Sequence, residues 1–170
     1  MRVLKVLGTL FVLIVCAVGV MLVMGSMLPH VHTASASVEI AAPQARVWQL
    51  LEDIHTQPTW RTGLLAVELT APENGHPCWT EVQKHMRMPL CEDVASPPST
   101  RIVRIADPSL PFGGDWVYQL QPIDANAMRL TITENGTTGP ALFRFIGHYI
   151  YGEDASIKQF EADVQKAVTK

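Results

Sequence analysis

The sequence of 170 residues contains no run of five or more basic residues, and its N-terminal part has almost no charge. Arg2 and Lys5 are the only charged side chains before residue 29. The remaining eleven basic residues stand against sixteen acidic ones, so residues 29–170 carry a net charge of −5. Nucleic acids and anionic lipid surfaces are poor electrostatic partners for such a chain. We therefore exclude nucleic-acid binding.

The sequence also lacks the motifs that hold cofactors and metals. It has no Gly-rich phosphate loop, no paired metal-ligand motif and no nucleophile elbow. His30 and His32 have the spacing of a chelating pair, but no third ligand lies near them, and we assign both to a solvated linker. We expect no cofactor and no metal.

Residues 6–28 form an apolar stretch without a single charge. Its 23 residues exceed the roughly 20 that a helix needs to cross a bilayer. Arg2 and Lys5 precede the stretch, and the next basic residue is Arg46. Since basic residues stay on the cytoplasmic side, we expect a cytoplasmic N-terminus and an exported remainder.

A cleaved signal peptide is the alternative, because residues 34–36 (ASA) fit a cleavage site. A signal peptide has an apolar region of only about 7–15 residues, which favours an uncleaved anchor. We expect residues 1–28 to hold the single-pass membrane helix, 29–33 to form a tether, and 34–170 to fold as an extracytoplasmic domain, periplasmic in a Gram-negative cell.

Residue periodicity predicts one sheet and one long C-terminal helix in this domain. The predicted strands are 34–41, 64–70, 78–84, 86–94, 99–106, 115–122 and 128–134, and the predicted helices are 43–54, a short turn at 58–61, and 141 to the C-terminus. Short, turn-rich connections imply an antiparallel sheet. The expected fold is therefore α+β, with a curved sheet wrapped on the long helix.

Two cysteines are placed to form a disulfide if residues 84 and 85 make a two-residue hairpin loop. The sequence numbers of two opposed residues then add up to 169, which puts Cys78 directly opposite Cys91. Directly opposed Cβ atoms lie about 4.5–5.5 Å apart, close to what a disulfide requires. Export favours oxidation, whereas two free thiols or a shifted register remain the alternatives.

The chain resembles the START-like, Bet v 1-like superfamily, and within it the polyketide cyclase/dehydrase-like branch called SRPBCC. The resemblance rests on element order over 34–168 and on the segments 38–43 (VEIAAP), 112–118 (FGGDWVY) and 131–136 (TITENG). It implies a helix-grip fold that encloses an apolar cavity for a hydrophobic small molecule or lipid. It implies no shared catalytic set, because activities differ within such a fold.

One face of the predicted sheet, together with the helix stripe, supplies a candidate cavity wall. Its residues are Trp79, Glu81, Met88, Leu90, Trp116, Tyr118, Leu130, Ile132, Glu134, Arg144, Phe145 and Tyr149.

The charged members of this wall have two possible roles. Glu81 and Glu134 could serve as general acids or bases, or could simply pair with Arg144, Arg104 or backbone donors. Arg144 could meet the polar head of a ligand, or form a surface ion pair with Glu134.

We rank three functions. The first is a membrane-anchored domain that binds a hydrophobic small molecule or lipid. The second is a non-catalytic interaction module of the cell envelope, and the third is a cyclase- or dehydratase-type enzyme using Glu81, Tyr118 or Arg144. The third needs at least two polar groups that converge on one ligand position. The sequence does not predict the oligomeric state.

The cysteine pairing can be tested by alkylation of the denatured full chain. Without reductant we expect a thiol reagent to modify Cys16 alone, because the other two sulfurs are bonded to each other. After reduction, mass spectrometry should find Cys78 and Cys91 modified as well. Equal modification with and without reductant would show that the pairing is wrong.

Overall fold

The computed structural model describes residues 2–169, and the side chains of Arg2 and Leu4 fall outside that description. Residues 1 and 170, at which the predicted anchor begins and the predicted domain ends, also lie outside it. The elements are α1 (Arg2–Met27), β1 (Val31–Ile40), α2 (Gln44–Glu52), the 3₁₀ turn η1 (Gln57–Thr59), β2 (Leu64–Glu73), β3 (His76–Gln83), β4 (Arg87–Ser96), β5 (Thr100–Ile105), β6 (Phe112–Pro122), β7 (Met128–Thr138), α3 (Ala141–Ile146), the π-helical turn η2 (Gly147–Tyr151) and α4 (Ala155–Val168).

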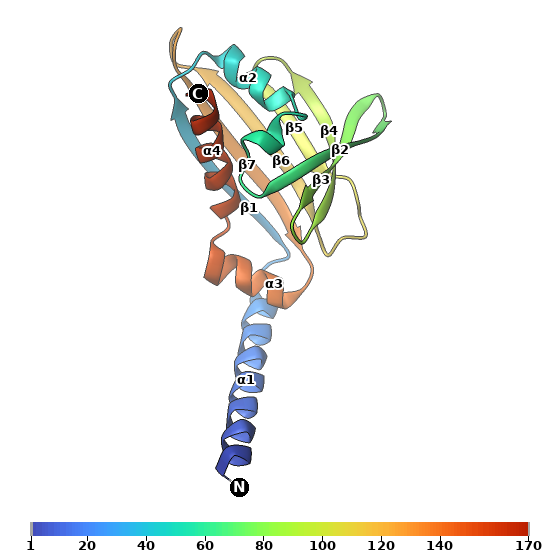
Figure 1. Cartoon of the computed structure of the whole chain (residues 1–170), viewed down its shortest axis with the longest axis vertical. Coiled ribbons are helices and arrows are strands. Elements are labelled where there is room, and N and C mark those ends of the chain that lie inside the picture. Colours follow the sequence, from blue (N-terminus) through green and yellow to red (C-terminus); the bar gives the residue numbers. More distant parts are fainter. Residues whose placement is uncertain (1, 170) are drawn as a thin grey trace.

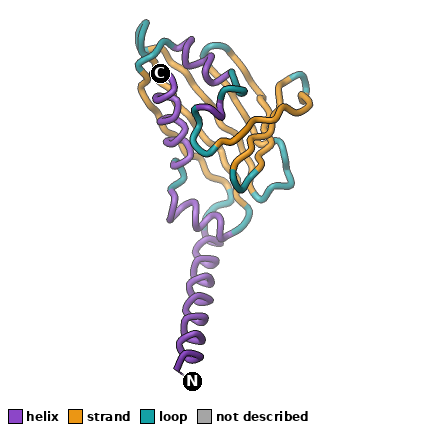
Figure 2. The backbone as a smooth tube through the Cα atoms, viewed as in Figure 1, coloured by secondary structure: helices purple, strands orange, loops and turns teal. Residues whose placement is uncertain are grey.

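The seven strands form one antiparallel sheet in the order β1-β7-β6-β5-β4-β3-β2. The sheet curves around α4, with α2 and η1 closing its upper end, and α1 projects away from the domain as a separate helix (Figure 1). Helices and strands therefore occupy separate layers (Figure 2). The predicted α+β fold with a helix-grip arrangement is confirmed.

The register predicted for the hairpin of β3 and β4 is also correct. Cys78 is paired with Cys91, and Trp79 with Leu90, as a two-residue loop requires. The structure joins Cys78 to Cys91 in a disulfide, with their Cα atoms 4.1 Å apart. The two alternatives, free thiols and a shifted register, do not describe this hairpin.

The tether is shorter than predicted. Strand β1 begins at Val31 instead of Ala34, since Val31 pairs with Thr137 and His32 with Gly136 of β7. Only residues 28–30 connect α1 to the sheet. The prediction of a linker over 29–33 was therefore wrong, because residues 31–33 pair with β7.

The predicted long C-terminal helix is broken into two parts. Gly152 has φ +83°, a left-handed conformation that ends η2, and α4 begins three residues later. Only α4 lies on the sheet, where Ile157 and Val164 are buried in the main core. The periodic stripe continues across the break, which is why periodicity alone predicted one helix.

Segment α3 packs instead against the C-terminal end of α1 (Figure 1). At Gly25 a Cβ atom would lie 2.0 Å from the carbonyl oxygen of Ala141, so only glycine allows this approach. Arg144 Nε donates a hydrogen bond to the carbonyl oxygen of Gly25 at 3.0 Å. A helix leaves its last four carbonyl groups without helical partners, and Arg144 satisfies one of them.

Polar bonds on two sides hold α4 against the domain. The Asp163 carboxylate accepts hydrogen bonds from the backbone N–H and the hydroxyl group of Thr62, at 2.7 and 2.8 Å. On the other side, Gln165 Nε2 donates to the carbonyl oxygen of Glu39 at 3.0 Å. These bonds connect α4 to the loop before β2 and to the end of β1.

One buried carboxyl group of α4 predicts how stability depends on pH. Burial raises the pKa of Glu161, with Asp154 adding to the effect and Lys158 opposing it. Its Oε1 atom has no hydrogen-bond partner among the described residues. Because the folded state holds this proton more tightly than the unfolded state, stability falls as pH rises above the ordinary value of 4.5.

We therefore expect Glu161→Gln to raise the unfolding temperature at pH 7 and to leave it unchanged near pH 4. Thermal unfolding of the full chain in detergent, followed by circular dichroism, measures this difference. Glu52→Gln, at an exposed position of α2, is the control that should change neither value. A lower unfolding temperature for Glu161→Gln at pH 7 would contradict the assignment.

Candidate functional site

A cavity of about 470 Å³ lies between the concave face of the sheet and the helices that cover it. Strands β3–β7 form its floor, while Leu51 of α2, Gln57 of η1 and Ile157 and Phe160 of α4 form its roof. A second group of buried apolar side chains, separate from the main core, joins four floor residues to Ile54 of the turn after α2: Trp79, Met88, Leu90 and Val103. The wall is therefore mostly aromatic and aliphatic.

Eight of the twelve predicted wall residues line this cavity: Trp79, Glu81, Met88, Leu90, Trp116, Tyr118, Ile132 and Glu134. The other four lie elsewhere. Leu130 is fully buried in the main core below α4. Phe145 and Tyr149 stack on each other, with ring centroids 5.0 Å apart, on the segment that turns away from the sheet. Arg144 holds the end of α1 and does not reach the cavity.

Of the two roles predicted for Arg144, the surface ion pair with Glu134 was wrong. Besides Gly25, its guanidinium donates to the carbonyl oxygens of Thr138 and Gly139 and lies 3.2 Å from His30 Nδ1. Arg144 is only 8% exposed, so a surface ion pair does not describe it. It lines a second hollow beside the tether, and its contact with a ligand head stays a prediction. Its role in the structure is to connect α1, β7 and α3.

Glu81 is held by an arginine that the sequence did not suggest. The two terminal nitrogens of Arg61, Nη1 and Nη2, both donate hydrogen bonds to the Glu81 carboxylate, and the bond from Nη2 measures 3.0 Å. Nη1 also donates to Gln57 Oε1 at 2.7 Å. The guanidinium lies over the ring of Phe160 at 5.0 Å. Because Glu81 is almost completely buried, this bidentate pair fixes the carboxylate as part of the wall.

A second arginine on the wall is also fully paired. Arg101 Nε donates to Glu92 Oε2 at 2.6 Å, and another of its nitrogens donates to the carbonyl oxygen of Leu51. Its guanidinium lies over the Trp79 ring at 5.5 Å. Neither arginine on the wall is thus left free to pair with an anionic ligand.

Tyr118 presents a hydroxyl group to the cavity without a partner among the described residues. Burial raises the pKa of Tyr118 to about 12, with Glu81 and Glu134 adding to the rise and Arg61 and Arg101 opposing it. The phenol therefore stays protonated at neutral pH. It can donate one hydrogen bond to a polar group of a bound molecule.

Glu134 stands at the end of the cavity that faces α3. Its Oε2 atom accepts hydrogen bonds from Trp116 Nε1 at 2.8 Å and from the Ser156 hydroxyl at 3.1 Å. Its Oε1 atom lies 3.4 Å from His32 Nε2. The partners of Glu134 therefore come from β1, β6 and α4. The predicted partners, Arg144 and Arg104, are not among them.

Sequence reasoning missed Arg61, Arg101 and His32 as wall residues. His32 could have been predicted, because alternate residues of a strand face the same side of the sheet. In β1 it therefore shares a side with the buried residues Ala34 and Ile40. Arg61 follows a turn, so no periodicity indicates which strand it reaches. Chemically, the wall offers aromatic and aliphatic surface and, within the described part of the chain, unpaired donors on Tyr118 and Trp79. Its two arginines are paired with Glu81 and Glu92.

Comparison of sequences finds one family match. The family described as "Polyketide cyclase / dehydrase and lipid transport" matches residues 31–170. No curated protein matches the chain by sequence.

Comparison of structures finds the same fold at low sequence identity. A START superfamily protein from Mycobacterium smegmatis has a TM-score of 0.65 at 13% identity, over 81% of this chain and 97% of that one. The Zhui aromatase/cyclase from Streptomyces sp. R1128 has a TM-score of 0.56 at 16% identity, over 82% and 88%. Norcoclaurine synthase from Thalictrum flavum, in complex with dopamine and hydroxybenzaldehyde, has a TM-score of 0.64 at 9% identity, over 82% and 87%. At these identities the likeness shows the fold alone.

The buried pair of Arg61 and Glu81 predicts a large cost when one partner is removed. We expect Glu81→Gln to destabilise the full chain by about 2 kcal/mol, below the usual range for buried pairs because Arg61 remains partly exposed. Replacing both residues by methionine should cost much less, because no buried charge is then left alone. Urea unfolding followed by tryptophan fluorescence measures each variant.

The exposed pair of Arg87 and Glu68 provides a matched control. Glu68→Gln should leave the unfolding midpoint unchanged, since solvent screens this pair. Equal effects of Glu81→Gln and Glu68→Gln would show that the pair in the cavity wall adds nothing to stability.

Proposed function

Because the chain belongs to the polyketide cyclase / dehydrase and lipid transport family, we propose that it is a membrane-anchored, exported domain that binds a hydrophobic small molecule or lipid. The observation that carries the proposal is the cavity of about 470 Å³ in a domain whose remaining core is closely packed. A protein of this size can fill its interior with side chains, so an unfilled apolar space suggests a ligand.

The wall chemistry favours a neutral ligand with one small polar group. Arg61 and Arg101 are occupied by Glu81 and Glu92, so a buried anionic head would find no free cation. Tyr118 offers a donor for a hydroxyl or carbonyl oxygen. The aromatic floor supplies apolar contact over the rest of the molecule.

The N-terminal helix supports the anchoring part of the proposal. Residues Lys5–Met27 form one helix that is long and apolar enough to cross a membrane, and Gly25 is its only buried residue. Arg2 and Lys5 stand before the span and no basic residue follows it until Arg46, which favours a cytoplasmic N-terminus. The domain would then lie outside the cytoplasm, in the periplasm of a Gram-negative cell.

The two other functions have less support. An interaction module would have no need of an unfilled cavity. A cyclase or dehydratase would need convergent free polar groups, and of its three candidates Arg144 lies outside the cavity and Glu81 is engaged by Arg61. Tyr118 is the remaining candidate for an acid–base role.

A photoactivatable fatty alcohol, with a diazirine on its chain, tests the proposal directly. The full chain in phosphatidylcholine vesicles should give crosslinks to floor peptides around Trp79 and Met88 as well as to α1. Val103→Phe, which fills part of the cavity from β5, should lower floor crosslinking roughly tenfold, a loss of about 1.4 kcal/mol. Crosslinks to α1 come from the bilayer and serve as the internal standard.

Val94→Phe is the matched control, because it makes the same change of side chain at an exposed position of β4. It should leave floor crosslinking unchanged. A wild-type protein that crosslinks through α1 but never through the floor would overturn the proposed function. Equal floor labelling in Val103→Phe and wild type would do the same.

A further inference from the structure

The segment formed by α3 and η2 is unusually apolar where it faces solvent. Between residues 139 and 152 the only charged side chain is Arg144, which is buried against α1. The exposed large side chains of the segment are Phe143, Tyr149, Ile150 and Tyr151. Tyr151 is 72% exposed, although nothing in the fold requires an aromatic residue to face water there. A contiguous exposed patch of this kind calls for a partner.

The position of this patch relative to α1 indicates what the partner is. Counting from Lys5, about 20 residues at 1.5 Å each span the roughly 30 Å of a bilayer's hydrocarbon core, which places the far boundary near Gly25. A tilted helix puts Gly25 still deeper. Gly25 is the residue that packs against Ala141 of α3. In the membrane, α3 and η2 therefore lie at the boundary between acyl chains and headgroups.

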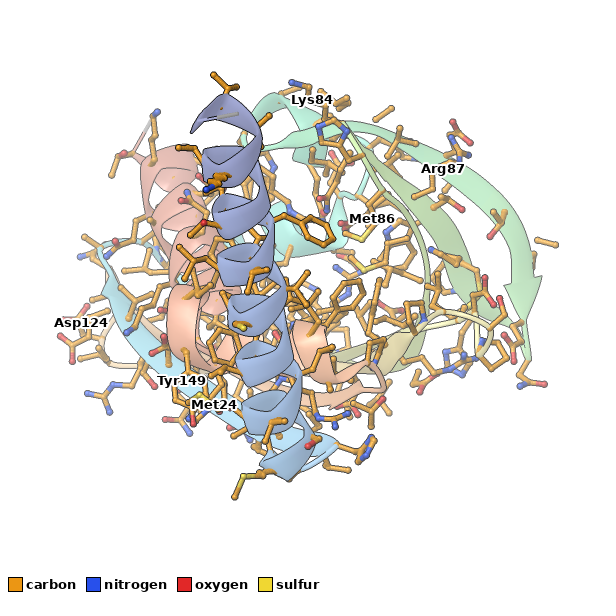
Figure 3. All side chains as sticks on the ribbon, turned by 90° about the horizontal axis from the view of Figure 1, so that it is seen from below. Met24, Lys84, Met86, Arg87, Asp124 and Tyr149 are labelled. Carbon is orange, nitrogen blue, oxygen red and sulfur yellow. A yellow bond between two sulfur atoms is a disulfide. The ribbon has the colours of Figure 1, made fainter. Side chains whose placement is uncertain are left out.

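The residue types fit that depth. Tyrosine is enriched at membrane–water interfaces, where its ring meets the acyl chains and its hydroxyl group meets the headgroups. Met27, at the end of α1, is 82% exposed beside the same junction. Figure 3 looks at the domain from the side of α1 and shows Met24 and Tyr149 on this face. Residues 139–152 contain no acidic side chain, and Glu153, which directly follows them, has its Oε1 atom 2.9 Å from His148 Nδ1.

A second hollow lies between this face and the cavity. It measures about 420 Å³ and is lined by Leu28 and Pro29 of the tether and by α3, η2 and the start of α4. It shares five residues with the main cavity: His32, Glu134, Thr138, Phe143 and Ser156. The two hollows therefore adjoin each other on the side of α1, and the pair of His32 and Glu134 forms the neck between them.

We propose that residues 141–151 dock in the bilayer interface and open this hollow to the adjacent leaflet, so that a membrane-dissolved lipid enters the cavity without crossing water. This rests on the proposed function for the identity of the cargo, but the docking itself does not. The occupant of the apolar face is the lipid bilayer. The path runs from the acyl chains past Leu28 and Pro29, through the neck, to the aromatic floor.

The depth of the segment can be measured with spin labels on the full chain. In a Cys16→Ala background, Ile150→Cys and Tyr151→Cys carry nitroxides in phosphatidylcholine vesicles, while the disulfide keeps Cys78 and Cys91 unlabelled. We expect the ratio of oxygen to nickel-chelate collisions at both sites to exceed several-fold that at Ile123→Cys. Ile123 is an exposed residue of the β6–β7 turn, at the opposite end of the sheet from the tether.

Equal, water-like ratios at residues 150, 151 and 123 would overturn the docking. Labels at residues 150 and 151 that neither reagent reaches would also overturn it, since a protein partner or a second copy of the chain would then cover the face. Either result would leave the cavity and its equilibrium ligand binding untouched, so it would not count against the proposed function.

The entry route is tested by the rate of cavity loading. After the diazirine fatty alcohol is added to the vesicles, Ile150→Glu should slow the appearance of floor crosslinks roughly tenfold, because a charge at this depth opposes docking. The final yield should not change. Ile123→Glu is the matched control and should load like wild type. An unchanged rate in Ile150→Glu, combined with a water-like collision ratio at Tyr151→Cys in the same variant, would show that the lipid enters elsewhere.

Discussion

The left-handed turn at Gly152 is the constraint on which the rest of the structure depends. It limits α4 to 14 residues, or about 21 Å, whereas the 11 residues of β6 and of β7 extend over about 36 Å. A helix continued through Gly152 would lie along the whole sheet and bury both groups of apolar residues. Because the chain turns away at Gly152, α4 reaches along β7 only as far as Glu134, and the strands beyond it border the cavity. The cavity exists because the covering helix is too short for its sheet.

The same turn frees α3 and η2 to contact α1, and here Arg144 is central. Its guanidinium binds carbonyl oxygens of Gly25, Thr138 and Gly139, so one buried cation joins the end of the apolar helix to the last strand and to α3. A positive charge at a helix C-terminus is also favoured by the helix dipole. The domain is therefore attached to α1 by a packed joint as well as by the three residues 28–30. Such a joint fixes which face of the domain lies nearest the membrane.

Local patterns in the sequence were sufficient for the sheet and for much of the cavity floor. Period-two alternation located the strands, and the hairpin register placed Trp79, Glu81 and Met88 on one face because a two-residue loop leaves a single pairing. The residues that form the roof of the cavity could not be predicted in this way. Arg61 reaches Glu81 from an irregular turn, and a 3.6-residue stripe looks the same whether it faces a sheet or, as Phe145 does, another helix. Contacts between segments far apart in sequence leave no trace in the periodicity of either one.

If α1 spans a bilayer as proposed, the joint at Gly25 couples the domain to the thickness of that bilayer. A free helix adjusts to a thicker or thinner bilayer by tilting, at a cost of a fraction of a kcal/mol per ångström of mismatch. Here α1 cannot tilt without carrying α3 and the sheet with it, since Gly25 and Ala141 are in direct contact. Bilayer thickness would thus set the angle at which the domain stands on the surface. A change in lipid composition would then act on this protein mechanically, through the orientation of the whole domain, as well as chemically, through the molecules available to bind.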